Sequence, residues 1–426
     1  MEKYSSYKDS GVQWLGEIPS HWNLFRLKQF VSIKKGIKPN LLTFDQIDYP
    51  YLSMNYLRSR EGKEIEYPTN NKGLFFVNED KTIVLWDGAN AGEFIKSKKG
   101  YLGSTMAILQ PNRQIYQEQY FFYLMKSIEP TSKDYANGTT IPHFNPSIIL
   151  DYNYPIPPIY EQQSMASYLD KATAEIDKAI AQQQHMIDLL NERKQIIIQR
   201  AVTKGLDENV EMKDSGVEWI GDIPAHWQVK KLKYIANTNS GSTPRNISGK
   251  GSPSSNIKWV RTTDLNNDIV TDTSEYLSKQ EMASASCPLL EPNTVLISMY
   301  GGSRSFGKIG ILGIEATINQ ALCSISANDD ILPKYLFYYL QSVNKIWMKF
   351  AASSRKDPNL NQEIIRNIHI AYPQSKDEQD MVVGMLEKSI REVNNGISQY
   401  ESLISTLQER KQIIISEVVT GKIKVS

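Results

Sequence analysis

The chain has 426 residues, with 48 Lys and Arg against 47 Asp and Glu, so its net charge is +1. At about 100 to 200 residues to a domain, this length predicts several domains rather than one compact core. The balanced charge excludes a basic tail or an acidic solvating segment, and the hydrophobic fraction of 40% excludes wholesale disorder.

A frame of short blocks occurs twice along the chain. KDSGVQWLGEIPSHW at residues 8–22 returns as KDSGVEWIGDIPAHW at residues 213–227, with eleven identities in fifteen positions. ERKQIII occupies both residues 192–198 and residues 409–415, and Glu161-Gln162 returns as Glu378-Gln379 at the same offset of 217. The blocks keep their order, so the pattern indicates a duplication of about half the chain, not a solenoid of short repeats.

A variable insert, residues 23–153, lies between the blocks of the first half. It holds 16 basic and 13 acidic side chains. Short polar and cationic side chains in loops can meet phosphates and base edges, although each one alone is better explained as a solvated surface residue. We expect DNA contacts from Lys34, Lys35, Asn55, Arg58, Asn90, Lys96, Lys98, Thr139, Thr140, His143 and Asn145.

One uninterrupted helix is predicted after the first insert. The stretch from Glu161 to Ala201 contains no Pro or Gly, and Lys204-Gly205 suits a helix stop. Its seam positions alternate steps of four and three, the 3.5-residue period of a coiled coil. At a rise of about 1.5 Å per residue the helix is a rod of roughly 60 Å. The predicted seam contains Met165, Leu169, Ala172, Ile176, Ala179, Gln183, Met186, Leu190, Lys194, Ile197 and Ala201.

The second insert, residues 228–371, holds 16 basic and 11 acidic side chains. Two echoes, YFFYL against YLFYYL and IPHFN against DPNLN, predict that both inserts share one fold. Arg can contact guanine and Asn can contact adenine in bidentate fashion, so its polar loops could read sequence in a major groove. The expected contacts are Ser242, Thr243, Arg245, Arg261, Thr262, Thr263, Arg304, Ser305, Lys308, Ser354, Arg355, Lys356 and Asn359.

A second long helix follows the second insert. At the offset of 217 its seam runs from Val382 through Leu403 to Val418. The economical arrangement is an antiparallel pair of helices that separates two globular domains in a pseudo-twofold molecule. The fold class is therefore α+β, with two α/β domains and two long antiparallel helices forming a coiled coil. The alternative is that each helix is an ordinary amphipathic helix packed on its own domain.

Catalytic motifs are not found in the sequence. There is no glycine-rich cofactor turn, no GxxxxGK[ST] phosphate loop and no credible carboxylate pair of a nuclease. Cys287 and Cys323 belong to no CxxC or Cys/His cluster, which argues against a structural zinc site and fits a reducing cytoplasm. No run approaches the roughly 18 apolar residues of a membrane span. We therefore expect no catalytic residue and no metal in this chain.

The repeated block carries one histidine and two tryptophans in each half. His21 and His226 each precede a Trp, and this shared context favours a structural histidine over a metal ligand or a base. The four tryptophans are expected to fix each domain to the rod. They are Trp14, Trp22, Trp219 and Trp227.

Two variable inserts in a duplicated frame resemble the specificity subunit (S subunit) of Type I restriction-modification enzymes. The resemblance spans essentially the whole chain. It implies that each insert is a target recognition domain for one half of a bipartite, gapped DNA target, and that the helices set the gap and dock the methyltransferase subunits. The expected domains are residues 1–155 and 207–372 for recognition, with spacer helices at residues 156–206 and 373–426.

The resemblance also implies the partners. These are double-stranded DNA, two modification (methyltransferase) subunits and the restriction (translocase and nuclease) subunits, in the cytoplasm and without a membrane. No cofactor is expected in this chain, because S-adenosylmethionine, ATP and Mg belong to the partner subunits. Two rival hypotheses are a stand-alone enzyme with an unrecognised site and a coiled-coil scaffold that binds only proteins.

Overall fold

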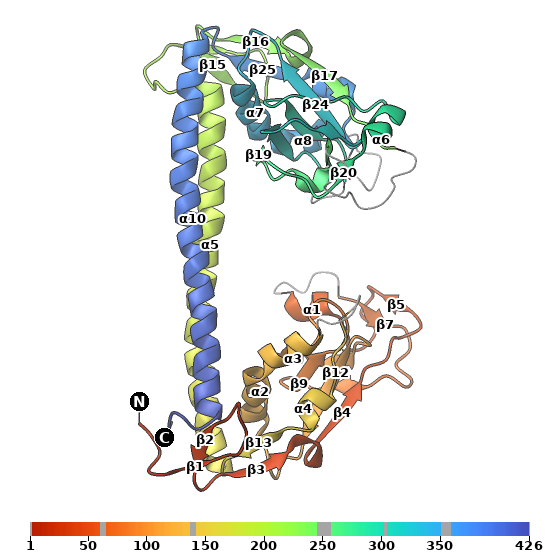
Figure 1. Ribbon diagram of the computed structural model, residues 1–426, viewed down its shortest axis with the longest axis vertical. Coiled ribbons are helices and arrows are strands. Elements are labelled where there is room, and N and C mark those ends of the chain that lie inside the picture. Colours follow the sequence, from red (N-terminus) through yellow and green to blue (C-terminus); the bar gives the residue numbers. More distant parts are fainter. Residues whose placement is uncertain are drawn as a thin grey trace. The chain divides into compact units, whose positions relative to one another are not determined.

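A computed structural model describes residues 2–59, 65–136, 142–244, 257–301, 305–350 and 359–425. The chain forms two compact units (Figure 1). Unit 1 contains Met1–Gln184 and Glu401–Ser426, and unit 2 contains His185–Tyr400. Within the described ranges, no helix is both long enough and apolar enough to cross a membrane.

Unit 1 is built around a four-stranded antiparallel sheet of order β10-β9-β12-β4 and a three-stranded sheet of order β6-β11-β8. Its elements before the first long helix are β1 (Tyr7–Asp9), β2 (Glu17–Pro19), β3 (Asn23–Arg26), η1 (Leu27–Gln29), β4 (Val31–Lys35), β5 (Leu42–Thr43), β6 (Tyr51–Leu52), α1 (Met54–Arg58), β7 (Tyr67–Pro68), β8 (Phe76–Val77), β9 (Thr82–Leu85), β10 (Phe94–Lys96), β11 (Gly100–Leu102), β12 (Met106–Pro111), α2 (Glu118–Ser127), α3 (Glu129–Ala136), α4 (Ser147–Leu150) and β13 (Asn153–Ile156).

Unit 2 is built around a five-stranded sheet of order β17-β24-β21-β22-β19 and strands in the order β20-β18-β23. Its elements between the long helices are β14 (Met212–Asp214), β15 (Asp222–Pro224), β16 (Gln228–Lys231), η2 (Leu232–Tyr234), β17 (Ala236–Ser240), β18 (Ile257–Val260), η4 (Thr262–Asp264), β19 (Ile269–Val270), β20 (Tyr276–Leu277), α6 (Lys279–Ser284), β21 (Val295–Ser298), β22 (Ile309–Leu312), β23 (Thr317–Ile318), β24 (Leu322–Ala327), α7 (Pro333–Ser342), α8 (Asn344–Phe350), α9 (Gln362–Asn367) and β25 (His369–Tyr372).

The two units share one topology, as the echoes in the inserts predict. In unit 1, β12 lies between β4 and β9, and in unit 2, β24 lies between β17 and β21. β3 pairs with β13 as β16 pairs with β25. The aromatic echo forms α2 and α7, in which Tyr120 and Tyr335 are fully buried. Buried aromatic side chains of these helices therefore supply a large part of each core.

Two long helices are present: α5 (Ile159–Lys204) and α10 (Lys376–Val419). Each is followed by a glycine with positive φ, Gly205 (+72°) or Gly421 (+76°), which is the usual chemistry of a helix C-terminus. In unit 1 the start of α5 shares a core with the end of α10, and in unit 2 the start of α10 shares a core with the end of α5. The helices therefore pair antiparallel in each unit, as predicted.

Equivalent polar contacts join the helices in both units. In unit 1, Lys411 Nζ lies 2.7 Å from both carboxylate oxygens of Asp177. In unit 2, Lys194 Nζ lies 3.1 Å from Asn394 Oδ1. Both lysines come from the repeated ERKQIII block, and Asp177 and Asn394 are separated by the same offset of 217. The repeat therefore fixes one register for the helix pair in both units.

The predicted seam is wrong by one residue near the middle of each helix. Met186 is 38% exposed, and the neighbouring Ile187 is buried. Leu403, which the repeat makes equivalent to Met186, is 42% exposed. A straight α-helix has 3.6 residues per turn, so a strict 3.5-residue pattern drifts off the packed face within a few turns unless the helices supercoil.

The repeated histidine and tryptophan anchor each domain to the start of a long helix. Trp22 Nε1 donates to Glu161 Oε2 at 3.0 Å, and His21 Nε2 lies 2.6 Å from Glu161 Oε1. In unit 2, Trp227 Nε1 donates to Glu378 at 2.8 Å and His226 lies 3.0 Å from the same carboxylate. The histidines are therefore structural, as predicted.

The glutamine after each of these glutamates makes a second repeated clamp. Gln162 Nε2 donates to the carbonyls of Ile115 and Pro157, and its Oε1 accepts from Gln117 N at 2.8 Å. Gln379 does the same with the carbonyls of Asp330 and Pro373 and with Leu332 N at 2.7 Å. Because both side chains are fully buried, leaving their partners unpaired would be costly.

Only one tryptophan of each block contacts the long helix in this way. Trp14 is 36% exposed and its ring packs against Tyr154 at 5.6 Å. Trp219 is half-buried and contacts the ring of Tyr339 at 6.5 Å. The prediction of four helix anchors is therefore wrong for this pair, which packs against the globular part of its own unit.

Replacing Glu161 with Gln is expected to destabilise unit 1 by about 1–3 kcal/mol, because its four hydrogen-bond partners, Tyr4, His21, Trp22 and Tyr160, lose a charged acceptor and one carboxylate oxygen becomes an NH2 group. Partial burial alone would raise the pKa of Glu161, but hydrogen bonds from His21, Trp22 and Tyr4 outweigh it and lower that pKa. The stabilisation is therefore present at neutral pH and is lost as the pH falls below 4.5, the usual pKa of this group.

Urea unfolding of the full chain at pH 7 and at acidic pH measures this effect. The difference between wild type and Glu161→Gln should shrink at acidic pH. Glu17→Gln, which changes an exposed glutamate of the same unit, is the matched control and should leave the midpoint unchanged. Equal midpoints for wild type and Glu161→Gln at pH 7 would contradict the anchor.

Candidate nucleic-acid interface

In unit 1, polar side chains meet where the strands of the central sheet end. Lys35 is the last residue of β4, and Asp87 follows β9. Lys35 Nζ lies 3.0 Å from Asp87 Oδ2, and His143 Nδ1 lies 2.7 Å from Asp87 Oδ1. A backbone bridge between Asp87 and His143 adds to this pairing. We call Lys35, Asp87 and His143 edge 1.

The electrostatics of edge 1 keep the carboxylate ionised. Partial burial alone would raise the pKa of Asp87, but the hydrogen bonds and charges of His143 and Lys35 outweigh it and hold that pKa below its usual range. Lys35 also lies over the Trp86 ring, 5.2 Å from its centroid. All three side chains of edge 1 remain open to solvent, with exposed fractions of 43%, 26% and 58% for Lys35, Asp87 and His143.

A close backbone approach fixes the strand end beside each edge. A Cβ on Gly36, directly after β4, would lie 2.2 Å from the carbonyl oxygen of Gly103. A Cβ on Gly241, directly after β17, would lie 2.2 Å from the carbonyl oxygen of Asn319. Since no side chain fits at such distances, both positions require glycine, and the chain leaves both strands along the same path.

A second group of candidate residues in unit 1 surrounds α1. Lys98 Nζ donates to the carbonyl oxygens of Tyr56 (2.8 Å) and Ser59 (3.1 Å). Arg58 lies 2.7 Å from Glu93, whose backbone N–H donates to the carbonyl of Asn90. Asn55 is exposed on α1. The structure thus brings Asn55, Arg58, Asn90 and Lys98 into one neighbourhood.

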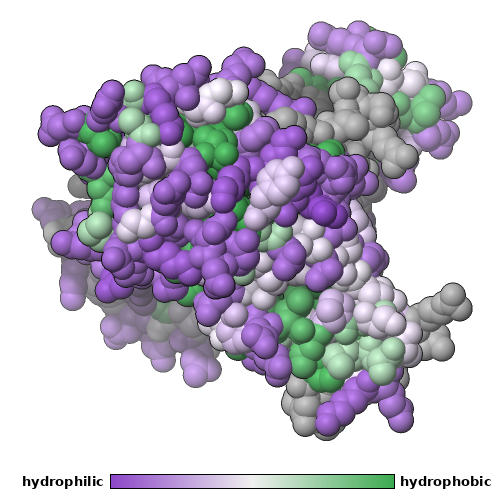
Figure 2. Space-filling model, turned by 90° about the horizontal axis from the view of Figure 1, so that it is seen from above, coloured by the Kyte–Doolittle hydropathy of each residue, from purple (hydrophilic) through white to green (hydrophobic). Residues whose placement is uncertain are grey.

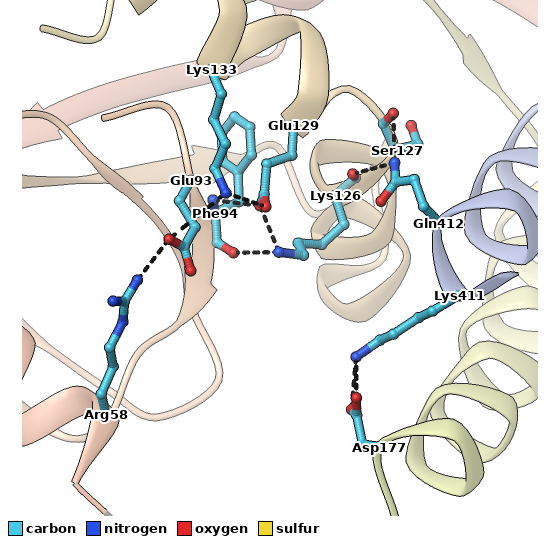
Figure 3. A network of polar contacts seen from close by, with 10 residues as sticks. All are labelled: Arg58, Glu93, Phe94, Lys126, Ser127, Glu129, Lys133, Asp177, Lys411 and Gln412. Carbon is cyan, nitrogen blue, oxygen red and sulfur yellow. Dashed lines mark hydrogen bonds and ion pairs between the residues drawn. The ribbon is translucent and has the colours of Figure 1, made fainter. Parts of the chain in front are cut away.

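Figure 3 shows that Arg58 begins a chain of polar contacts that reaches α10. Glu93 and Glu129 both lie within ion-pair distance of Lys133, at 3.8 and 3.1 Å. Glu129 also pairs with Lys126 on α2 at 2.5 Å. Gln412 Nε2 on α10 then donates to the carbonyls of Lys126 and Ser127 at 3.1 Å. The neighbourhood of α1 is therefore connected to the long helix.

The remaining candidates of unit 1 have separate surroundings. Lys96 pairs with Asp170 of α5 at 3.5 Å, so it faces the long helix. Lys34 lies 4.0 Å from the centroid of the Phe75 ring. Asn145 is exposed and its Oδ1 accepts from Ser147 N at 3.1 Å, as at a helix start. Thr139 and Thr140 lie outside the described residues.

Pairing registers identify the equivalent edge of unit 2. Ala107 of β12 pairs with Lys35, and Cys323 of β24 pairs with Ser240. Met106 pairs with Leu85 as Leu322 pairs with Ser298, so Asp87 corresponds to Tyr300.

The segment with the second echo gives the third position. Phe144 N donates to Trp86 O, and Leu360 N donates to Met299 O, both at 2.8 Å, so His143 corresponds to Asn359. We call Ser240, Tyr300 and Asn359 edge 2. Of these six edge residues, Asp87, Ser240 and Tyr300 were not among the candidates from sequence.

Other candidates of unit 2 lie close to Tyr300. A Cβ on Gly301 would lie 2.9 Å from Ser305 Cβ and 3.7 Å from Thr262 Oγ1. Thr262 and the exposed Thr263 belong to η4, which follows Arg261. Arg261 is held by Glu275 at 2.7 Å. Lys308 N donates to the carbonyl of Ser305.

Two more candidates follow β17, and several cannot be placed. Ser242 N donates to the carbonyl of Ile318 at 3.1 Å, and Thr243 is exposed. The candidates outside the described residues are Arg245, Arg304, Ser354, Arg355 and Lys356.

The side chains of the two edges can contact a polar, charged ligand. In the described part of the chain, no three His, Cys, Asp or Glu side chains come together as metal ligands would. Figure 2 shows one face of the molecule, on which hydrophilic side chains (purple) cover most of the surface and hydrophobic ones (green) lie between them in small groups. Exposed Lys, His and Asn side chains at strand ends can contact phosphates and base edges.

Comparison with known proteins places the chain in context. The family model described as "Type I restriction modification DNA specificity domain" matches residues 19–184 and 224–400. The chain is 27% identical to the Type I restriction enzyme MjaVIII specificity subunit of Methanocaldococcus jannaschii, over 96% of this chain and 94% of the relative. It is 20% identical to the EcoKI specificity subunit of Escherichia coli, over 92% and 88% of the two chains.

A solved structure has a similar fold. It comes from work on complex assembly and conformational transition of the type I R-M system, with a TM-score of 0.60 and 15% identity. The likeness covers 94% of this chain and 98% of the other.

Proposed function

The chain belongs to the type I restriction-modification DNA specificity family, and on that premise we propose that it is the subunit that gives such an enzyme its DNA sequence specificity. Each unit reads one half of a bipartite, gapped target. The observation that carries this proposal is the double match of the family model, one match to each half of the chain. The equivalent edges 1 and 2 provide each half with exposed or half-buried polar side chains at the same strand ends.

The contacts divide into two kinds. Phosphate contacts from cations such as the exposed Lys34 and Lys35 and the half-buried Lys308 orient each unit on the duplex, and base contacts select the half-site. Residues 1–155 and 207–372 are the proposed target recognition domains, and the candidate residues named above are their proposed DNA contacts. Salt should weaken the phosphate part strongly, because neutralising phosphates releases counterions.

Partner subunits supply the chemistry in this proposal. Two modification subunits, which hold S-adenosylmethionine, dock on the long helices and methylate adenine. Restriction subunits use ATP and Mg to cleave unmethylated DNA in the cytoplasm. This chain itself then has no catalytic residue, in keeping with the relatives named as specificity subunits. No described contact favours the alternative of a scaffold that binds only proteins.

A map of methylated adenines in the native cell, with and without this gene, tests the function. We expect a two-part motif with a fixed gap that disappears when the gene is deleted. The motif also gives both half-sites and the gap length. If the native cell expresses the chain and every methylated motif is still present after the gene is deleted, the specificity role is wrong. A protein-binding scaffold would instead leave methylation unchanged and have no salt-dependent affinity for DNA.

A further inference from the structure

Position 87 of unit 1 and position 300 of unit 2 are equivalent, but they carry different chemistry. Each directly follows the residue after a central strand, β9 or β21, and each lies beside the segment of the second echo. The frame around them is preserved to the level of single hydrogen bonds. Asp87 and Tyr300 therefore differ where the backbone paths are the same, which is the arrangement expected for residues that distinguish two half-sites.

The carboxylate of Asp87 is held in one orientation by its partners. Lys35 donates to one oxygen and His143 contacts the other. An ionised carboxylate has about four acceptor positions, so two donors leave room for a third. The charge of Lys35 also reduces the repulsion between this carboxylate and DNA phosphates. A carboxylate in a major groove accepts from an exocyclic amino group, such as N4 of cytosine.

Tyr300 presents a neutral hydroxyl and an aromatic ring instead. It is half-buried, and burial raises the pKa of its phenol, so the hydroxyl keeps its proton. Its neighbours in edge 2, Ser240 and Asn359, carry no charge. Gly301 follows with φ of +133°, a conformation that favours glycine and turns the backbone directly after Tyr300. The ring can contact a thymine methyl group, and the hydroxyl can donate or accept.

We propose that Asp87 and Tyr300 are specificity-determining residues, each selecting one base pair of the half-site that its own unit reads. Asp87 favours the orientation of the pair that offers an amino group to its carboxylate. This inference rests on the proposed function, because it assumes that each unit reads a half-site.

The test uses the chain assembled with its modification subunits. The probe is a set of DNA duplexes that carry the mapped target and every single-base change of it, and the measurement is the relative rate of adenine methylation. Asp87→Asn keeps the shape of the side chain but replaces one acceptor oxygen with an NH2 donor. We expect it to lose about 10-fold discrimination at one position of one half-site, the usual size for a base contact. The other half-site and the gap should not change.

Two matched variants complete the design. Asp151→Asn alters another exposed ion pair of unit 1, Lys28 to Asp151 at 2.8 Å, and should leave every preference unchanged. Tyr300→Phe removes one oxygen atom and should alter one position of the other half-site only.

The proposal is overturned if Asp87→Asn methylates with wild-type preferences, or if it weakens both half-sites equally. Where Asp87→Asn yields no methylation at all, Tyr300→Phe decides by the same criterion. A wild-type complex that recognises no gapped motif would instead overturn the proposed function, so the two failures are distinguishable.

Discussion

Deleting residues 182–188 together with residues 399–405 is expected to shorten the gap in the DNA target while both half-sites stay the same. The two segments are equivalent by the offset of 217, and each removes one heptad from a long helix. Seven residues at a rise of 1.5 Å are about 10 Å of helix. At 3.4 Å per base pair this corresponds to about three base pairs.

Methylation mapping in a cell that expresses the doubly deleted chain measures the gap. Removing a whole heptad keeps the phase of the apolar face, so the helices can pair again in register. Deleting five residues from each helix is the informative comparison, because at 3.6 residues per turn it rotates the buried face by about 140° away from its partner and should abolish methylation. A motif with new half-sites and the old gap would contradict a helical spacer.

Replacing residues 23–153 with residues 228–369 of the same chain should produce a target with two copies of one half-site. The splice points follow the sheet registers, in which Asn23 corresponds to Gln228 and Asn153 corresponds to His369. The anchors Trp22, Glu161 and Gln162 are retained. Because the two units share one topology, the grafted insert meets the same frame.

Methylation mapping again gives the answer for the exchanged chain. The half-site of the original first insert should vanish completely. A control that replaces residues 23–153 with themselves through the same cloning junctions should keep the native motif. Loss of both half-sites in a chain that still assembles with the proposed modification subunits would show that the inserts do not read DNA independently.

Much of the frame could be predicted because repetition and periodicity are local signals. The absence of Pro and Gly between Glu161 and Ala201 predicts α5, and the repeated His-Trp pair predicts an anchor. The burial of Ile187 in place of Met186 could not be predicted. It depends on how far each helix follows a 3.5-residue rather than a 3.6-residue period.

The candidate site was harder to predict because its parts are distant in sequence. His143 and Asn359 carry a visible echo, but Asp87 meets His143 only through a bridge between segments 56 residues apart. No local pattern marks Asp87 or Tyr300. Lys96 has the side-chain type expected of a DNA contact, but it forms an ion pair with Asp170 on α5. Tertiary packing decides which lysine and arginine side chains already have an ion-pair partner. Composition alone does not show these pairings.

The make-up of unit 1 determines when its core can be completed during synthesis on the ribosome. Ile415, Val418 and Val419 belong to the core of unit 1, and Tyr120 Oη donates to the carbonyl of Val419. Unit 2, by contrast, is one contiguous stretch, His185–Tyr400. The unit whose translation starts first is therefore completed last. Until residues 401–426 emerge, the core of unit 1 lacks Ile415, Val418 and Val419 and its apolar face stays uncovered, whereas unit 2 already has every residue of its core.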